Sequence, residues 1–149
     1  MTTELKWTTP ESIATALSTE LNSLANGSYS AASSAIDNAT GLYQFIELEL
    51  YLASLTPVSG QSVTVYLLAS ADGTNYASGG GSVAPPSNAL LTVFDLRAAT
   101  ATQRRVSRVL EIPPLSFKLV VGNASIASGV AFASSGNTLK YRRFNVQAV

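Results

Sequence analysis

The chain has 149 residues, no cysteine and no histidine, and nine basic residues balance nine acidic ones to a net charge of zero. This length suits one domain, and the missing residues exclude disulfides, thiolate metal sites and Ser-His-Asp or cysteine-based catalysis. Only 12% of the residues are charged, whereas 46% are hydrophobic. Such a weakly charged surface suits either a protein packed against neighbours or a weakly charged monomer.

The N-terminal residues have a weaker pattern than the rest of the chain. Residues 3–8 predict a short strand that carries Trp7. Thr9 and Pro10 then resemble a helix start, and apolar residues follow at spacings of four, four and three, at Ile13, Leu17, Leu21 and Leu24. We therefore expect a helix over residues 10–25, with an extended arm as the alternative because many of these residues are poor helix formers.

Residues 27–41 are mostly Ser, Ala, Gly and Asn. Small polar residues bury little surface and cost entropy to order, so this stretch predicts a linker, or an arm that orders on a partner. The expected organisation is an N-terminal arm over residues 1–41 and a strand-rich domain over residues 42–149.

The strongest strand signal lies between Gln44 and Tyr76. Alternating apolar residues at positions 46, 48, 50 and 52 indicate a strand with one buried face, and positions 63, 65 and 67 repeat the pattern. Pro57 and Gly60 lie between the two arms, which predicts a β-hairpin.

Further strands are predicted over residues 90–96, 104–112, 117–121, 130–133 and 139–146. Residues 77–88 contain three consecutive glycines and Pro85-Pro86, which favours a loop. Short strands separated by turn residues, with no recurring helix, predict an all-β fold: an antiparallel β-sandwich, of which the jelly roll is one form.

Opposite charges occupy the two halves of the chain. Up to residue 75 there are seven acidic residues and one basic residue, and beyond it eight basic and two acidic ones. The halves can attract each other within one fold or across an interface between copies, and the sequence does not choose between these alternatives. The predicted partner-contact residues are Trp7, Leu17, Leu21, Glu47, Glu49, Arg104, Arg105, Arg142 and Arg143.

Catalytic and ligand-binding patterns are weak. Glu47 and Glu49 lie two residues apart on one strand face, but their neighbours give no sign of a cleft, so a solvated or subunit-facing strand is favoured over a glycosidase pair. Asp72 to Tyr76 predicts an Asx-stabilised turn rather than a calcium loop. We expect no enzyme activity, cofactor, metal or nucleic-acid partner.

The sequence contains no run long enough to span a membrane and no signal-peptide pattern at its start. We therefore expect a protein made in a cytosol, with no membrane partner.

Several turns and strand ends form a combined pattern: Leu68–Tyr76, Ala84–Ala89, Val93–Leu96, Ile112–Asn123 and Ser135–Lys140. Together they resemble small virion structural proteins of tailed bacteriophages, over roughly residues 42–146. The pattern contains no catalytic signature, so the resemblance implies a role and no site. Leu115-Ser116 stands where a turn such as Pro-Gly would be expected.

The resemblance implies a capsid decoration (cement) protein of the virion, made in the host cytoplasm. Such a protein would form a homo-oligomer, with a trimer expected, and would bind the major capsid protein or other virion proteins. The alternative is a tail- or fibre-associated module that recognises host surface glycans through exposed aromatic residues.

Overall fold

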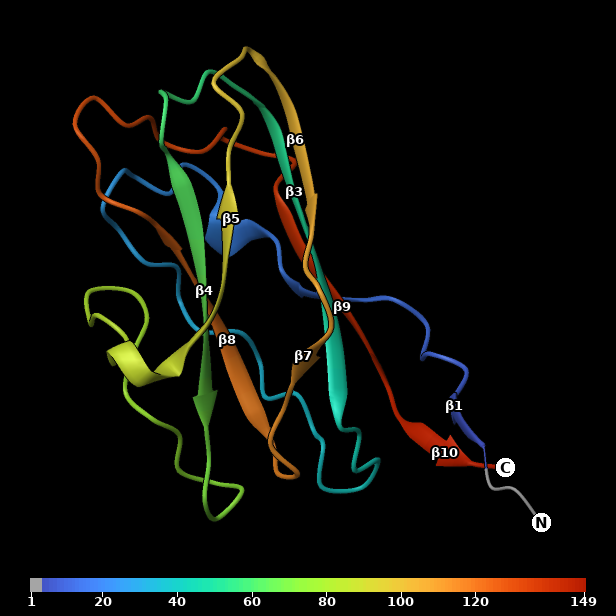
Figure 1. Ribbon diagram of the computed structural model, residues 1–149. Coiled ribbons are helices and arrows are strands. Elements are labelled where there is room, and N and C mark those ends of the chain that lie inside the picture. The colour runs from blue at the N-terminus through green and yellow to red at the C-terminus, as the bar shows by residue number, and fades with distance from the viewer. Residues whose placement is uncertain (1–3) are drawn as a thin grey trace.

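The computed structural model describes residues 4–149 and is an all-β, antiparallel sandwich (Figure 1). The first sheet has the order β2-β9-β3-β6, and β7 also pairs with β3. The second sheet has the order β5-β4-β8.

The first sheet consists of β2 (Ala14–Leu17), β3 (Phe45–Leu55), β6 (Ala101–Val106), β7 (Leu110–Glu111) and β9 (Thr138–Phe144). The second consists of β4 (Ser62–Ala69), β5 (Leu90–Asp95) and β8 (Phe117–Asn123). The predicted sandwich is confirmed, and the jelly roll stays a prediction.

Two short strands at the ends of the described chain form a third sheet. β1 (Leu5–Trp7) pairs antiparallel with β10 (Val146–Ala148), and Figure 1 shows this pair at one corner, away from both main sheets. Single 3-10 turns occur at η1 (Thr19–Leu21) and η2 (Ser87–Ala89). The strand predicted at residues 3–8 is therefore present at its centre.

The core lies between the two main sheets and follows the alternation in the sequence. Ile46, Leu48, Leu50 and Leu52 on β3 are completely buried, as are Val63 and Val65 on β4. Burial of this many aliphatic side chains, each stabilising by about 1.5–3 kcal/mol, is the main term that favours the fold.

The predicted hairpin between β3 and β4 is wrong. β3 pairs with β6, β7 and β9, whereas β4 pairs with β5 and β8, so the connection over residues 56–61 crosses from one sheet to the other. Alternating apolar residues show only that each arm has one buried face. They fit two strands that pack face to face as well as two strands that pair.

The helix predicted over residues 10–25 is also wrong. Ala14–Leu17 form β2 at the edge of β9, and only one 3-10 turn follows. Leu17, Leu21 and Leu24 still lie in the core, although Ile13 is 54% exposed. The Ser- and Thr-rich composition disfavours a helix, and pairing with β9 supplies the backbone hydrogen bonds instead.

Residues 28–36 are an integral part of the second sheet and not a linker. Ser30, Ser33 and Ile36 each donate a backbone hydrogen bond to β8, to the carbonyls of Val121, Leu119 and Phe117 at 2.7–2.9 Å. The hydroxyls of Ser30 and Ser33 also accept the backbone N–H groups of Val121 and Leu119, both at 3.0 Å. Every third residue of this segment, at positions 30, 33 and 36, thus bonds to the edge of β8. The hydroxyl oxygens of Ser30 and Ser33 accept the N–H groups of β8 that a carbonyl of a neighbouring strand would otherwise accept.

This packing corrects the domain boundary predicted at residue 41. Residues Leu17, Leu21, Leu24 and Ile36 belong to the same core cluster as β3, β4 and β8. Residues 14–38 are therefore part of the sandwich, and only the β1 end of the predicted arm lies apart from it.

The outer face of the second sheet is covered by the loop over residues 77–86. Leu68 and Val120 point away from the main core, yet they are only 2% and 0% exposed. Gly80, with a φ of 97°, lies so close to Ser30 and Ala32 that an added Cβ would be 3.0 Å from their backbone atoms. The predicted loop is confirmed, and its glycines allow it to lie flat on the sheet.

A buried pair of amide side chains fastens the loop over residues 124–137. Gln61 donates to Asn123 at 3.0 Å, and both side chains donate to the carbonyl of Val130, at 2.8 and 2.9 Å. Asn123 also donates to the carbonyl of Leu24 at 3.1 Å. The strand predicted over residues 130–133 is absent, because Val130 bonds to these side chains and only two backbone hydrogen bonds, Phe132 to Leu24 and Ser23 to Ala133, follow it.

Candidate partner-contact surface

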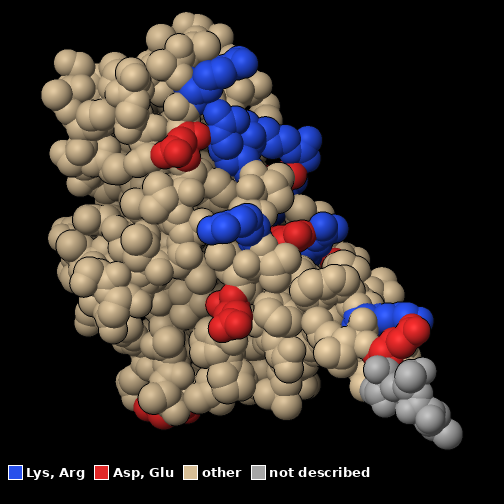
Figure 2. Space-filling view, viewed as in Figure 1, with Lys and Arg blue, Asp and Glu red and all other residues tan. Residues whose placement is uncertain are grey.

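The charged residues gather on one side of the sandwich. Strands of the first sheet carry eight charged residues, whereas those of the second carry only Asp95 and Lys118. Figure 2 shows this as blue and red side chains over β6, β9 and the terminal strands, beside a face with few charges over β4 and β5. The first sheet therefore presents the surface with the greater capacity for polar recognition.

Ion pairs within the chain join the two halves of opposite charge on the outer face of this sheet. Glu47 on β3 pairs with Arg142 on β9 at 2.6 Å, and Glu49 pairs with Arg104 on β6 at 2.7 Å. Each arginine donates from two nitrogens to one carboxylate oxygen. Attraction within one fold, one of the two alternatives predicted from the charges, therefore accounts for these residues. The sheet register places Glu47 directly opposite Arg142, and it places Arg104 diagonally from Glu49, because Arg104 is directly opposite Tyr51.

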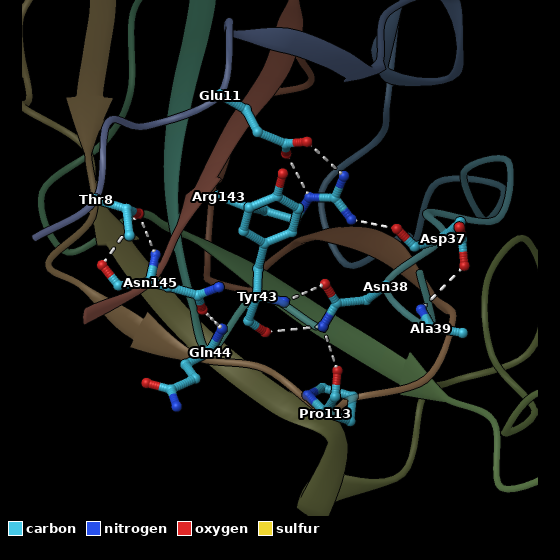
Figure 3. Close-up of polar contacts among 10 residues, drawn as sticks. All are labelled: Thr8, Glu11, Asp37, Asn38, Ala39, Tyr43, Gln44, Pro113, Arg143 and Asn145. Carbon is cyan, nitrogen blue, oxygen red and sulfur yellow. Dashed lines mark hydrogen bonds and ion pairs between the residues drawn. The ribbon is translucent and has the colours of Figure 1, made fainter. Parts of the chain in front are cut away.

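Arg143 is enclosed by three segments that are distant in sequence (Figure 3). It pairs with Glu11 at 2.7 Å, donates to the backbone carbonyl of Asp37, and lies 4.7 Å from the ring centre of Tyr43. A hydrogen bond to the neighbouring Glu11 carboxylate raises the pKa of the Tyr43 phenol. The backbone N–H of Ala39 lowers the pKa of the Asp37 carboxyl. Arg143 is thus a structural clamp with little surface left for a partner, because its side chain is only 11% exposed.

Arg104 and Arg105 point to opposite faces, as the sequence predicts for neighbours on a strand. Arg104 lies on the outer face, whereas Arg105 donates to the backbone carbonyl of Asp95 at 2.7 Å and to the side chain of Gln103 at 3.0 Å. Arg105 therefore joins β6 to β5 and closes one open side of the sandwich.

Leu17 and Leu21 were predicted partner contacts, but they are 1% and 0% exposed. Their burial in the core removes them from any contact surface of the folded chain. Trp7, in contrast, is 59% exposed, and its ring packs edge to face on Phe45 and Phe144 at 5.5 and 5.3 Å. Trp7 is therefore the predicted aromatic residue that remains available to a partner.

Exposed apolar residues surround the two ion pairs. Ile13 and Val106, 54% and 61% exposed, line a shallow recess with Glu47 and Glu49. A second recess beside it is lined by Val109, Trp7, Phe144 and Arg142, among others. The outer face of the first sheet thus combines apolar side chains with neutralised charges, a composition typical of protein interfaces.

The terminal ribbon, formed by β1 and β10, continues this surface. Leu5 and Trp7 lie opposite Ala148 and Val146, so all four side chains share one face. Lys6 lies opposite Gln147 on the other face. Leu5 is 75% exposed, and the ribbon therefore presents an apolar face to solvent.

Asp72 forms the predicted turn. One carboxylate oxygen accepts the backbone N–H groups of Thr74 and Asn75 at 2.9 and 2.7 Å, and the other accepts the Asn75 side chain at 2.7 Å. These donors, led by the Asn75 N–H, hold the pKa of this carboxyl well below its usual range. Both oxygens are thus engaged within the turn, as an Asx-stabilised turn requires.

Two other kinds of site are absent from the described part of the chain. Residues 4–149 contain no group of three or more His, Cys, Asp or Glu side chains placed to hold a metal ion. Within the same range, no helix has the length and apolar character needed to cross a membrane.

Sequence reasoning missed the exposed apolar residues on and beside the first sheet, which include Leu5, Ile13, Leu42, Val106 and Val109. A partial signal was available for the ribbon, because Leu5 and Trp7 alternate with Glu4, Lys6 and Thr8 and so mark an amphipathic strand. No signal in the sequence pairs that strand with residues 146–148, nor places Ile13 beside Val106.

The sequence matches no protein-family model, and no curated protein is significantly similar to it. The resemblance to phage virion proteins therefore stays a prediction.

Proposed function

We propose that this chain is a structural protein of a phage particle, a capsid decoration protein that self-associates and binds the outer surface of the shell. The supporting observation is the uncovered apolar surface on the ribbon and the first sheet, where Leu5, Trp7, Ile13 and Val106 are each more than half exposed. Exposed apolar side chains do not stabilise a monomer, whereas their burial against other proteins of an assembled particle is favourable.

The proposed role is stabilisation of the shell by linkage. A protein that binds assembled capsid proteins, but not the dissociated ones, shifts the equilibrium towards the assembled shell. The paired Glu47–Arg142 and Glu49–Arg104 side chains suit this role, because the charges are already neutralised within the chain and bring little repulsion to a contact. A trimer is the proposed oligomer.

The test uses expanded capsids that lack the protein. We expect the purified protein to cosediment with these capsids and to raise the temperature at which they dissociate. A matched Ile13→Asp, Val106→Asp variant should bind at least tenfold more weakly, whereas Val83→Asp, on a loop away from the first sheet, should bind like the wild type. Absence of cosedimentation at saturating protein contradicts the proposal.

A second candidate function, glycan recognition, has one observation in its favour. A recess of about 190 Å³ is lined by Tyr29, Tyr66, Thr64 and Ser125, among others. Aromatic rings beside hydroxyl groups suit a sugar, but these two rings already contact each other edge to face at 5.9 Å. Retention on a glycan array that is lost in Tyr66→Ala, with no binding to capsids, would favour this alternative.

A further inference from the structure

We propose that the terminal ribbon of one copy docks, through its apolar face, into a groove beside the ribbon of a second copy. This inference deepens the self-association contained in the proposed function. Each copy contributes its ribbon to one contact and its groove to another.

The ribbon has an exposed apolar face, and its edges carry backbone N–H and C=O groups that the ribbon itself does not pair. The backbone groups of Glu4 and Val149 bond to each other in both directions, and the N–H of Thr8 donates to the carbonyl of Asn145. Along an antiparallel pair, every second residue bonds to the partner strand, so the N–H and C=O groups of Leu5 and Trp7 point away from β10. Two strands alone are marginally stable in water, and a further partner over the apolar face stabilises them.

The ribbon is nevertheless held firmly at its base. The Trp7 ring packs on two phenylalanines, and Asn145 donates to the hydroxyl of Thr8 at 2.8 Å while its side chain accepts the N–H of Gln44 at 2.7 Å. Figure 3 shows Thr8, Asn145 and Gln44 in this arrangement. A fixed ribbon loses less entropy on docking than a flexible tail would.

The groove lies next to that base. It is an open space of about 460 Å³, lined by Leu42, Tyr43, Gln44, Phe45, Glu111, Ile112 and Pro114. The side chain of Asn38 joins its two walls, because it donates to the carbonyls of Tyr43 and Pro113 at 2.8 and 2.7 Å and accepts the N–H of Tyr43 at 3.0 Å. The groove is therefore formed before any partner arrives, and its lining is mostly apolar.

Leu42 supplies an independent indication of a contact. It is 57% exposed, and its φ of 46° places a leucine in the left-handed region, which glycine adopts readily but leucine rarely does. A strained and exposed apolar residue at the edge of an apolar groove is costly to the isolated chain. Covering Leu42 with the apolar face of a ribbon would recover part of that cost.

A second copy is the occupant that fits these features. One ribbon offers only four apolar side chains, Leu5, Trp7, Val146 and Ala148, which is too few for the roughly 800 Å² that a stable interface buries on each partner. When every copy gives one ribbon and receives another, the contact doubles without any new element. The zero net charge of the chain and the internal Glu4–Lys6 pair leave no long-range repulsion between copies.

The experiment measures the molar mass of the full chain by size-exclusion chromatography with light scattering over a wide range of concentration. We expect the wild type to exceed the monomer mass of 15.5 kDa. Leu5→Asp, which alters the ribbon, and Leu42→Asp, which alters the groove, should each weaken association at least tenfold and run as monomers. Val83→Asp, at a comparably exposed site on a different loop, should retain the wild-type mass.

A mixture of the two variants gives the most decisive measurement. Leu5→Asp keeps an intact groove and Leu42→Asp keeps an intact ribbon, so an equimolar mixture restores one of the two contacts. At a concentration at which each variant alone is monomeric, the mixture should show a higher average mass, although it associates more weakly than the wild type. Unchanged thermal melting of both variants shows that the fold is retained. A monomeric wild type, or a Leu5→Asp variant that keeps the wild-type mass, overturns the inference.

The two proposals fail in different ways. If the wild type self-associates through Leu5 but never binds capsids, the ribbon inference stands and the decoration role fails. If the wild type is monomeric and Leu5→Asp lowers capsid binding, the ribbon docks on the capsid protein and docking between copies is overturned.

Discussion

The two main sheets of this sandwich differ in how their outer faces are covered. On the second sheet, the chain itself covers the edge of β8 with residues 28–36 and the outer face at Leu68 and Val120 with the loop over residues 77–86, although Leu90 and Val93 on β5 remain exposed. On the first sheet, the outer face carries ion pairs and exposed apolar residues and remains open. The difference teaches that the chain covers more of the second sheet than of the first, which is why we propose the first sheet as the partner surface.

The largest expected effect comes from deleting residues 1–38. This deletion removes Leu17, Leu21, Leu24 and Ile36 from the core and uncovers the edge of β8. Each lost core residue costs about 2–5 kcal/mol, so the four together cost about 8–20 kcal/mol, which is as large as the roughly 5–15 kcal/mol by which domains are stable. We expect an unfolded chain by circular dichroism. Deleting only residues 1–8 should leave a folded sandwich, and a folded 39–149 fragment would show that the covering segment is dispensable.

Asn123→Ala should have the next largest effect. It removes one hydrogen bond from each of three interior groups, the Gln61 amide and the carbonyls of Leu24 and Val130, and at about 1 kcal/mol a bond this costs about 3 kcal/mol. Chemical denaturation measures the free energy of unfolding. Asn88→Ala, at an exposed position in η2, serves as the matched control and should change it little.

Ser33→Ala tests whether hydroxyl oxygens complete the second sheet. The variant removes the acceptor of the buried Leu119 N–H and should lower the free energy of unfolding by about 1–2 kcal/mol. The neighbouring Ser34 is exposed, so Ser34→Ala should be close to neutral. Equal effects of the two substitutions would contradict the role assigned to residues 28–36. Faster amide exchange at Leu119 in Ser33→Ala alone would support it.

The ion pairs on the first sheet should contribute far less. A double-mutant cycle of Glu47→Gln and Arg142→Gln should give a coupling of about 0.5 kcal/mol that decreases with added salt, since Arg142 is 48% exposed. A coupling of several kcal/mol would mean that this face is a stabilising element of the fold rather than an open surface.

The smallest effect concerns the turn at the end of β4. The folded state holds the pKa of Asp72 below its usual value, so its contribution to stability is present above about pH 4 and is lost as the pH falls further. Asp72→Asn should therefore lower stability slightly at neutral pH and flatten the acid side of the stability curve. Thermal melting between pH 2 and pH 7 measures this difference, and parallel curves for variant and wild type would contradict it.

The sequence by itself determined the all-β class, most strand positions, the loop over residues 77–88 and the Asp72 turn. These features depend on local patterns, such as apolar alternation, paired prolines and Asx chemistry, that act over a few residues. For the same reason, the alternation correctly named the buried side chains at positions 46, 48, 50, 52, 63 and 65, although Leu67 is only partly buried.

Only the tertiary structure decided which strands pair and which surface stays open. Alternation is identical for paired and for face-to-face strands, so β3 and β4 were assigned to a hairpin although they lie in different sheets. The residues at 13, 17, 21 and 24 fit a helical spacing, yet long-range pairing with β9 prevailed over that weak propensity.

The candidate surface was predictable only in part. Glu47, Glu49, Arg104 and Arg142 do lie together, but the sheet register joins them within the chain. Leu17 and Leu21 turned inward, whereas Ile13 and Leu42 stayed outside. Exposure of an apolar residue depends on which segments of the rest of the chain reach it, and contacts between distant segments are formed only when the whole sandwich assembles.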